Sequence, residues 1–290
     1  METTTQKSLL ITVRDTISCS QGVRFVGSFF KKHDDLMLTL FYVMPNPVSD
    51  QSMMDPWAEE NTSVSVFPSA IAKVFTLCTN VLLKKGFSEN QIHKIARRKQ
   101  SGTVQDIISE GKRGLYDAVI LGKKSTSFLE NIFAGNMGHD ILEKELAAPV
   151  WFCRDPDETR KNVLLCLDGS SMGEKVANHV GYILQNENHH SVTLFYVDKG
   201  QRVDQEKIFL DATAVLKSYS IPDDRINKST VTSLRVTNTI LAKAEREKFA
   251  VIAIGSIGRT ATKGICDRII GTKCKNIFNE IDKTALWIVP

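Results

Sequence analysis

One turn in the second half of the chain combines glycine with residue types that bind phosphate groups. Gly255 and Gly258 follow a hydrophobic run, and twelve residues then separate Gly258 from Gly271 and Thr272. Glycines between a strand and a helix let backbone N–H groups approach an anion, and the helix N-terminus adds partial positive charge. Four basic residues lie nearby: Arg259, Lys263, Arg268 and Lys273. The turn is therefore predicted to bind an anion such as a phosphate, although glycine is also common in turns without a ligand.

The first half contains a related but altered turn. Gly122 is followed by Ser125, and nine residues separate Ser125 from Gly135 and Asn136. Ser125 carries a Cβ atom where the second half has glycine, which narrows the approach of a phosphate or disfavours a positive φ. Asn136 can still donate a hydrogen bond, with a different reach from the hydroxyl of Thr272. We therefore favour the second half as the anion site.

An aspartate and a valine mark the ends of two further hydrophobic runs in each half. Asp15 and Asp168 end the first run, and Val43 and Val197 end the second. Ligands of open parallel sheets bind beyond the carboxyl ends of the strands, where the strand order reverses. Aspartate, valine and glycine would then meet at one edge of each predicted sheet. The sequence supports a role for the two aspartates as caps or turn residues about equally well.

The chain contains the same pattern twice. Residues 39–43 and 193–197 are identical, and a hydrophobic run with a tryptophan, Trp151 or Trp287, closes each half. The aspartate run, the identical run, the glycine run and the tryptophan run recur in the same order. This order indicates a duplicated domain.

Each half has the pattern of strands that alternate with amphipathic helices, which implies right-handed crossovers and a mainly parallel sheet. The predicted fold is α/β, with two tandem open-sheet domains, each a mainly parallel five-stranded sheet with helices on both faces. We place the domains at residues 1–154 and 161–290. The hydrophilic stretch from Arg154 to Arg160 at their boundary suits a short exposed linker. The predicted strands lie near residues 9–13, 36–43, 91–97, 116–121, 150–153, 163–167, 191–197, 225–231, 249–254 and 285–289. The predicted helices lie near residues 23–30, 71–82, 104–111, 140–146, 172–185, 204–219 and 237–247, with a last one before residue 285.

The composition is that of an ordinary globular protein. The 290 residues include 37 basic and 33 acidic side chains, for a net charge of +4. So mild a charge does not point to a nucleic-acid or membrane partner. The start lacks a signal-peptide pattern, and no apolar run approaches the length of a membrane span. We therefore expect a cytoplasmic location.

Other features of the sequence have unremarkable interpretations. The six cysteines form no C-x-x-C pair and are predicted to be small buried hydrophobes, with no metal site. His189 and His190 are predicted to lie in a solvated turn. Residues 45–61, with three prolines, are a lid over a ligand crevice, a partner surface or a plain surface loop.

The whole arrangement resembles the universal stress protein family, in particular its tandem members with two such domains in one chain. The resemblance covers nearly all 290 residues. Family members that bind ATP carry G-x2-G-x9-G-S/T after the fourth strand and an aspartate after the first. The first half keeps this spacing, with Ser125 for the second glycine and Asn136 for the hydroxyl residue. The second half keeps both glycines and Thr272, but has twelve residues where the pattern has nine.

The resemblance implies a role for each matching residue. Asp168 or Asp15 would contact the adenine and ribose side of a nucleotide, and Val197 or Val43 would line the adenine pocket. The turn residues would contact ribose and phosphates, and they are Gly255, Gly258, Gly271 and Thr272 in the second half and Gly122, Ser125, Gly135 and Asn136 in the first.

The function implied is that of a stress-response regulatory protein that binds ATP or a related adenine nucleotide, with or without Mg²⁺, most favourably in the second domain. The runner-up is a scaffold of the same fold without nucleotide. An ATP pyrophosphatase is disfavoured, because neither first strand runs into a Ser-Gly-Gly-x-Asp-Ser loop, and slow ATP hydrolysis is the most activity expected. The resemblance also implies that domains pair through their last strands. That pairing would make an internal pseudo-dimer, to which a homodimer could be added.

Overall fold

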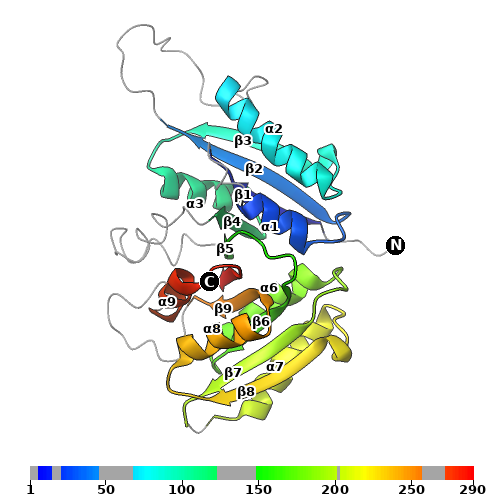
Figure 1. Ribbon diagram of the computed structural model, residues 1–290, viewed down its shortest axis with the longest axis vertical. Coiled ribbons are helices and arrows are strands. Elements are labelled where there is room, and N and C mark those ends of the chain that lie inside the picture. Colours follow the sequence, from blue (N-terminus) through cyan, green and yellow to red (C-terminus); the bar gives the residue numbers. More distant parts are fainter. Residues whose placement is uncertain (1–5, 15–20, 46–67, 123–147, 201–202, 257–271) are drawn as a thin grey trace.

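The computed structural model describes residues 6–14, 21–45, 68–122, 148–200, 203–256 and 272–290. Strands and helices alternate through both halves, as the sequence predicts (Figure 1). The strands are β1 (Lys7–Thr12), β2 (Leu36–Met44), β3 (Ile92–Arg98), β4 (Ala118–Gly122), β5 (Val150–Cys153), β6 (Lys161–Leu167), β7 (Val192–Asp198), β8 (Ile226–Thr232), β9 (Phe249–Gly255) and β10 (Ala285–Val289). The helices are α1 (Gln21–Phe29), α2 (Ser69–Lys84), α3 (Thr103–Arg113), α6 (Met172–Leu184), α7 (Gln205–Ser218), α8 (Val236–Arg246) and α9 (Thr272–Glu280).

The strands form one sheet across both halves, in the order β3-β2-β1-β4-β5-β10-β9-β6-β7-β8. Neighbouring strands within each half are parallel. At the centre, β5 and β10 are antiparallel, with Trp151 opposite Trp287. The predicted α/β fold with two mainly parallel five-stranded sheets is confirmed. The predicted pairing of the halves through their last strands is confirmed as well, and it joins the two sheets into one.

Burial explains why these segments form inner strands. Leu9, Leu10 and Ile11 on β1 are all fully buried, because helices cover both faces of the sheet. One hydrophobic core packs the sheet against α1, α2, α6 and α7, and a second packs the other face against α3, α8 and α9. Each core contains residues from both halves. Among the described residues, no helix is long and apolar enough to cross a lipid bilayer.

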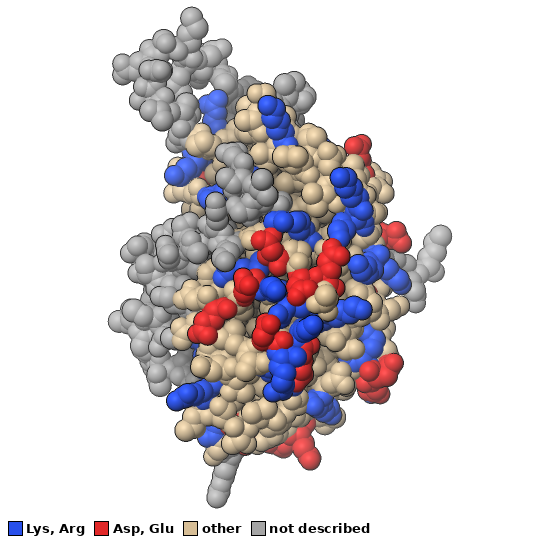
Figure 2. Space-filling model, viewed as in Figure 1, with Lys and Arg blue, Asp and Glu red and all other residues tan. Residues whose placement is uncertain are grey.

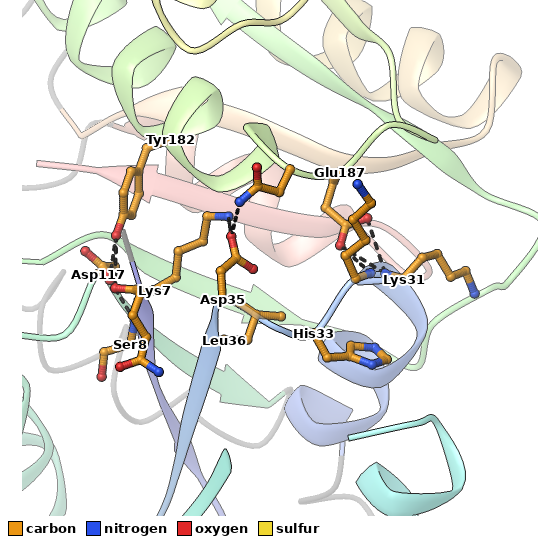
Figure 3. Close-up of polar contacts among 12 residues, drawn as sticks. Lys7, Ser8, Lys31, His33, Asp35, Leu36, Asp117, Tyr182 and Glu187 are labelled. Carbon is orange, nitrogen blue, oxygen red and sulfur yellow. Dashed lines mark hydrogen bonds and ion pairs between the residues drawn. The ribbon is translucent and has the colours of Figure 1, made fainter. Parts of the chain in front are cut away.

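The contact between the halves also has a polar part, at the amino ends of β1 and β2 (Figure 3). The buried Lys7 ammonium pairs with the buried Asp35 carboxylate, which also accepts a hydrogen bond of 2.6 Å from Asn186 of the second half. Beside this pair, the Tyr182 hydroxyl donates to Asp117 over 3.3 Å. Asn186 and Tyr182 of the second half thus donate hydrogen bonds to two carboxylates of the first half, those of Asp35 and Asp117.

The prediction of a solvated turn at His189 and His190 is wrong for His190. Only 3% of His190 is exposed, and its ring stacks on Phe29 with centroids 4.1 Å apart. Nε2 of His190 lies 2.9 Å from the Phe29 carbonyl at the end of α1, and His189 lies 3.0 Å from the same oxygen. The segment looks polar in sequence, but it docks on the other half. There the buried Glu187 carboxylate also accepts the backbone N–H groups of Lys31 and Lys32.

The prediction of an exposed linker is wrong for its two ends. Arg154 and Arg160 are 5% and 6% exposed, respectively. Arg160 donates to the Thr284 hydroxyl over 3.1 Å and pairs with Glu245, and Arg154 donates to the Phe278 carbonyl over 2.6 Å. The arginine stems therefore pack into the molecule, and their charged ends find partners in the second half.

Candidate functional site

Three predicted site residues lie at the carboxyl edge of the second half of the sheet. Asp168 directly follows β6, Val197 lies near the end of β7, and Gly255 ends β9. Leu167 pairs with Tyr196 and Leu165 with Ala253, so the three strand ends are adjacent.

The strand order reverses at this point of the sheet. The chain passes from β6 to β7 and β8 on one side, and then returns to β9 on the other side of β6. Asp168 and Gly255 therefore flank the switch point between β6 and β9, where parallel sheets of this kind bind ligands. The helix α9 begins at Thr272 and forms part of the layer that covers one face here.

Asp168 has a local structural role in addition to its position. Its Oδ1 atom accepts the N–H of Ser170 over 3.0 Å, which makes an Asx turn. Gly169 within that turn has a φ of 76°, which suits glycine. Asp168 is thus a turn residue, as the alternative interpretation predicts. Its carboxylate nevertheless lies at the switch point between β6 and β9.

Two lysines gather beside Asp168. Lys273 is the second residue of α9 and Lys199 follows β7, and both are half-buried. Burial and the neighbouring Lys199 ammonium lower the pKa of Lys273, whereas the Asp168 carboxylate raises it. Lys273, in the first turn of a nine-residue helix, therefore lies close to both a second cation, Lys199, and the Asp168 carboxylate. This arrangement favours an additional anion.

Lys199 is the residue that the sequence interpretation missed. It stands directly after the second strand, one position beyond Asp198, so its place at the carboxyl edge was available as a signal. The following Gly200 has a φ of 75°, and its N–H donates to Asp198 Oδ1 over 2.8 Å. This tight turn keeps Lys199 near the end of β7.

Buried apolar side chains pack at this edge of the sheet. Val197 is 8% exposed, and the Cys274 thiol lies 3.5 Å from the Gly255 carbonyl, which fixes the first turn of α9 to the end of β9. Burial raises the pKa of the Cys166 thiol, and nearby Cys274 and Asp168 add to the effect, so that the thiol is neutral. Cys78, Cys153 and Cys274 are buried, as predicted for small hydrophobic residues, whereas Cys166 is half-buried, and none of the four forms a disulfide.

The first half places Val43 near the end of β2 and Gly122 at the end of β4, at the matching edge of its own sheet. The other predicted residues of that half, Asp15, Ser125, Gly135 and Asn136, lie outside the described residues. In the second half, Gly258, Gly271, Arg259, Lys263 and Arg268 also lie outside them, as do Cys19, Cys266, most of residues 45–61 and the helix predicted near 140–146. Only the backbone of Thr272 is described.

The fold and the position of the site define a tandem α/β protein with an open, mainly parallel sheet, and solved structures share this architecture. No family model matches the chain, and a search of curated proteins found no match. A universal stress protein from Archaeoglobus fulgidus aligns over 99% of this chain and 97% of its own, with a TM-score of 0.63 at 13% identity.

Two proteins from Pseudomonas aeruginosa are also similar over nearly their whole length. A protein described as a putative universal stress protein covers 99% of this chain and 94% of its own, with a TM-score of 0.56 at 14% identity. A protein of unknown function covers 99% and 93%, with a TM-score of 0.56 at 15% identity. The chain thus has the tandem fold of universal stress proteins along nearly its full length.

Proposed function

We propose that this protein binds ATP or a related adenine nucleotide at the carboxyl edge of its second half, and that it acts as a regulatory protein of the stress response. The observation that carries the proposal is the convergence of Asp168, Lys199 and Lys273 at the switch point between β6 and β9.

The charges there fit the phosphates of a nucleotide. Lys199 and Lys273 repel each other, and Asp168 offsets only part of their charge. A bound phosphate would supply the missing negative charge, and the N-terminus of α9 would stabilise it further. Lysine is a common phosphate ligand because its ammonium acts as a compact point charge.

The apolar part of the edge fits a nucleobase. Val197 offers a largely buried hydrophobic surface beside the Asp168 carboxylate, which can accept hydrogen bonds from ribose hydroxyls or from an exocyclic amine. In this proposal the adenosine side of the nucleotide lies toward Val197 and Asp168, and the phosphates lie toward Lys199 and Lys273. Pockets with apolar walls and a few polar groups are typical of such ligands.

Regulation requires that the nucleotide bind two states of the protein with different affinity. Strand β9, which ends at the site, pairs directly with β10, and β10 pairs with β5 of the first half. A change in α9 or β9 on binding would therefore reach the contact between the halves through one intermediate strand. This continuity supports a regulatory role for the nucleotide.

The proposal is tested by the nucleotide content of the purified chain. The protein is denatured, the released adenine nucleotide is quantified per chain, and nucleotide-free protein is titrated with ATP in the presence and absence of Mg²⁺. We expect one site per chain, and two sites would show that the altered turn of the first half also binds. No released nucleotide and no uptake on titration would contradict the proposal and favour the scaffold.

A further inference from the structure

A cavity lies where the two halves meet, away from the proposed nucleotide site. Its volume is about 380 Å³, enough for a small metabolite. The segment between the halves contributes one wall, the N-terminal residue of α1 another, and the turn before β10 a third. The lining residues are Gln21, Arg154, Asp155, Pro156, Asp157, Asp282 and Lys283. Acidic and basic side chains are interspersed across the middle of the molecule in Figure 2.

Arg154 is the unusual residue of this cavity. It is 5% exposed, its Nη2 donates to the Phe278 carbonyl over 2.6 Å, and its guanidinium lies 4.8 Å from the centre of the Phe278 ring. Its Nε is buried and has no hydrogen-bond partner among the described residues. Arg154 also lines the cavity, and a guanidinium edge is suited to a carboxylate. Its charge therefore lies at the wall of a space large enough for a ligand.

The carboxylates of the cavity differ in their partners. Asp155 pairs with Arg24 over 2.5 Å and accepts a hydrogen bond from Gln21 over 3.0 Å. Asp157 accepts hydrogen bonds from the N–H and the hydroxyl of Thr159. Asp282 is exposed, makes no hydrogen bond or ion pair with another described residue, and lies close enough to Arg154 to act on its charge.

We propose that this cavity binds a free α-amino acid. The α-carboxylate would accept hydrogen bonds from the Arg154 guanidinium, and the α-ammonium would pair with Asp282. The side chain of the ligand would occupy the remaining volume beside Pro156 and Gln21. Arg154 and Asp282 line the same cavity and carry opposite charges, so a ligand with one charge of each sign fits it.

The cavity offers a ligand charges of both signs. Asp155 pairs with Arg24 and Asp157 pairs with Arg160, which leaves Asp282, Arg154 and Lys283 for a ligand. A zwitterion carries no net charge and satisfies both signs. The cavity takes residues from both halves and from the segment between them, so that its ligand would hold the halves together. This site is separate from Asp168, Lys199 and Lys273, and the proposal does not depend on nucleotide binding.

The test is a thermal-shift screen of the full chain with each of the twenty common L-amino acids at about 10 mM, a concentration that detects millimolar binding. The best hit is then titrated by calorimetry, alongside its deaminated acid and its decarboxylated amine. We expect one site per chain, and at least ~10-fold weaker binding of the acid and the amine. Asp282→Asn should weaken binding of the amino acid by at least ~10-fold, while the matched control Asp211→Asn, an exposed aspartate on α7, leaves it unchanged.

Two results would overturn the proposal. One is the absence of any shift with all twenty amino acids, which would leave only solvent in the cavity. The other is unchanged affinity in Asp282→Asn, or equally tight binding of the deaminated acid, either of which would show that the ammonium is not recognised. Arg154 also donates a hydrogen bond to the Phe278 carbonyl, so its replacement could lower the stability of the protein. The binding test therefore replaces Asp282, which is exposed.

Discussion

The indole rings of Trp151 and Trp287 stack with their centroids 4.0 Å apart and their planes inclined by 9°. They occupy equivalent positions in the two halves and lie opposite each other in the antiparallel β5–β10 pair. This is the contact expected at an internal pseudo-twofold axis. The symmetry is incomplete, because Trp151 Nε1 donates to His179 over 2.9 Å, whereas Trp287 Nε1 has no hydrogen-bond partner among the described residues.

Replacement of one stacked indole should strongly destabilise the protein. Trp151 is fully buried, so Trp151→Ala removes a large side chain from the core shared by the halves and leaves a cavity. We expect a loss of about 3–5 kcal/mol in the free energy of unfolding, measured by urea denaturation. Leu234→Ala is the control, because Leu234 is 85% exposed and should change little. Similar losses in the two variants would contradict this account of the junction.

Acid should destabilise the protein through two buried histidines. Burial lowers the pKa of His179 and of His190 to about 3, whereas an unfolded histidine has a pKa near 6.5. The stability that they contribute is therefore fully present above pH 6.5 and is lost as the pH falls from there toward 3. Each histidine should lower the free energy of unfolding by on the order of 1 kcal/mol for each pH unit of acidification in this window.

The pH effect can be separated from that of the carboxylates. Burial raises the pKa of Glu187 and of Asp117, and this acts in the opposite direction as the pH falls. Urea unfolding between pH 7.5 and 5 should therefore be compared for wild type, His179→Gln and His190→Gln, since the carboxylates remain in all three. Each variant should lose stability less steeply on acidification. An unchanged slope in both would show that the two rings do not stay neutral in the folded protein.

Replacement of Lys7 should lower the free energy of unfolding, because it breaks a buried ion pair. Lys7 and Asp35 form a buried ion pair, and Lys7→Met leaves the carboxylate with Asn186 as its side-chain donor among the described contacts. Breaking a buried pair on one side typically costs about 3–5 kcal/mol. Lys217→Met is the matched control, since Lys217 pairs with Asp223 on the surface. Chemical denaturation should show a much larger loss for Lys7→Met, and equal losses would contradict the importance of burial.

Much of the fold was predictable because its signals are local. The hydrophobic runs mark the strands, and the repeated run 39–43 and 193–197 aligns the halves. The pairing of the tryptophan strands also followed, from the family resemblance and from the need to cover an apolar edge. A local stretch of sequence does not show which residues of the other half will contact a given polar side chain. His190 and Arg154 look solvated in sequence and are buried by contacts across the junction.

The candidate site was predictable to a similar extent. The ends of hydrophobic strands placed Asp168, Val197 and Gly255 at one edge, since carboxyl ends of parallel strands meet there. Lys199 was missed because its place after a strand, the one signal that the sequence offered, does not distinguish it from other residues at strand ends. It becomes a candidate through its nearness to Lys273, which is distant in the chain and is brought close only by the fold.

We propose that the carboxyl edge of the second half binds an adenine nucleotide through Lys199 and Lys273. The most direct test is the dissociation constant for ATP, measured by calorimetry on wild type, Lys273→Ala and Lys228→Ala. Lys228 is an exposed lysine on the edge strand β8, paired with Leu194 near the start of β7, so its loss removes the same charge away from the site. We predict at least ~10-fold weaker binding in Lys273→Ala and no change in Lys228→Ala. Equal affinity in all three proteins, or no binding by wild type, would contradict the claim.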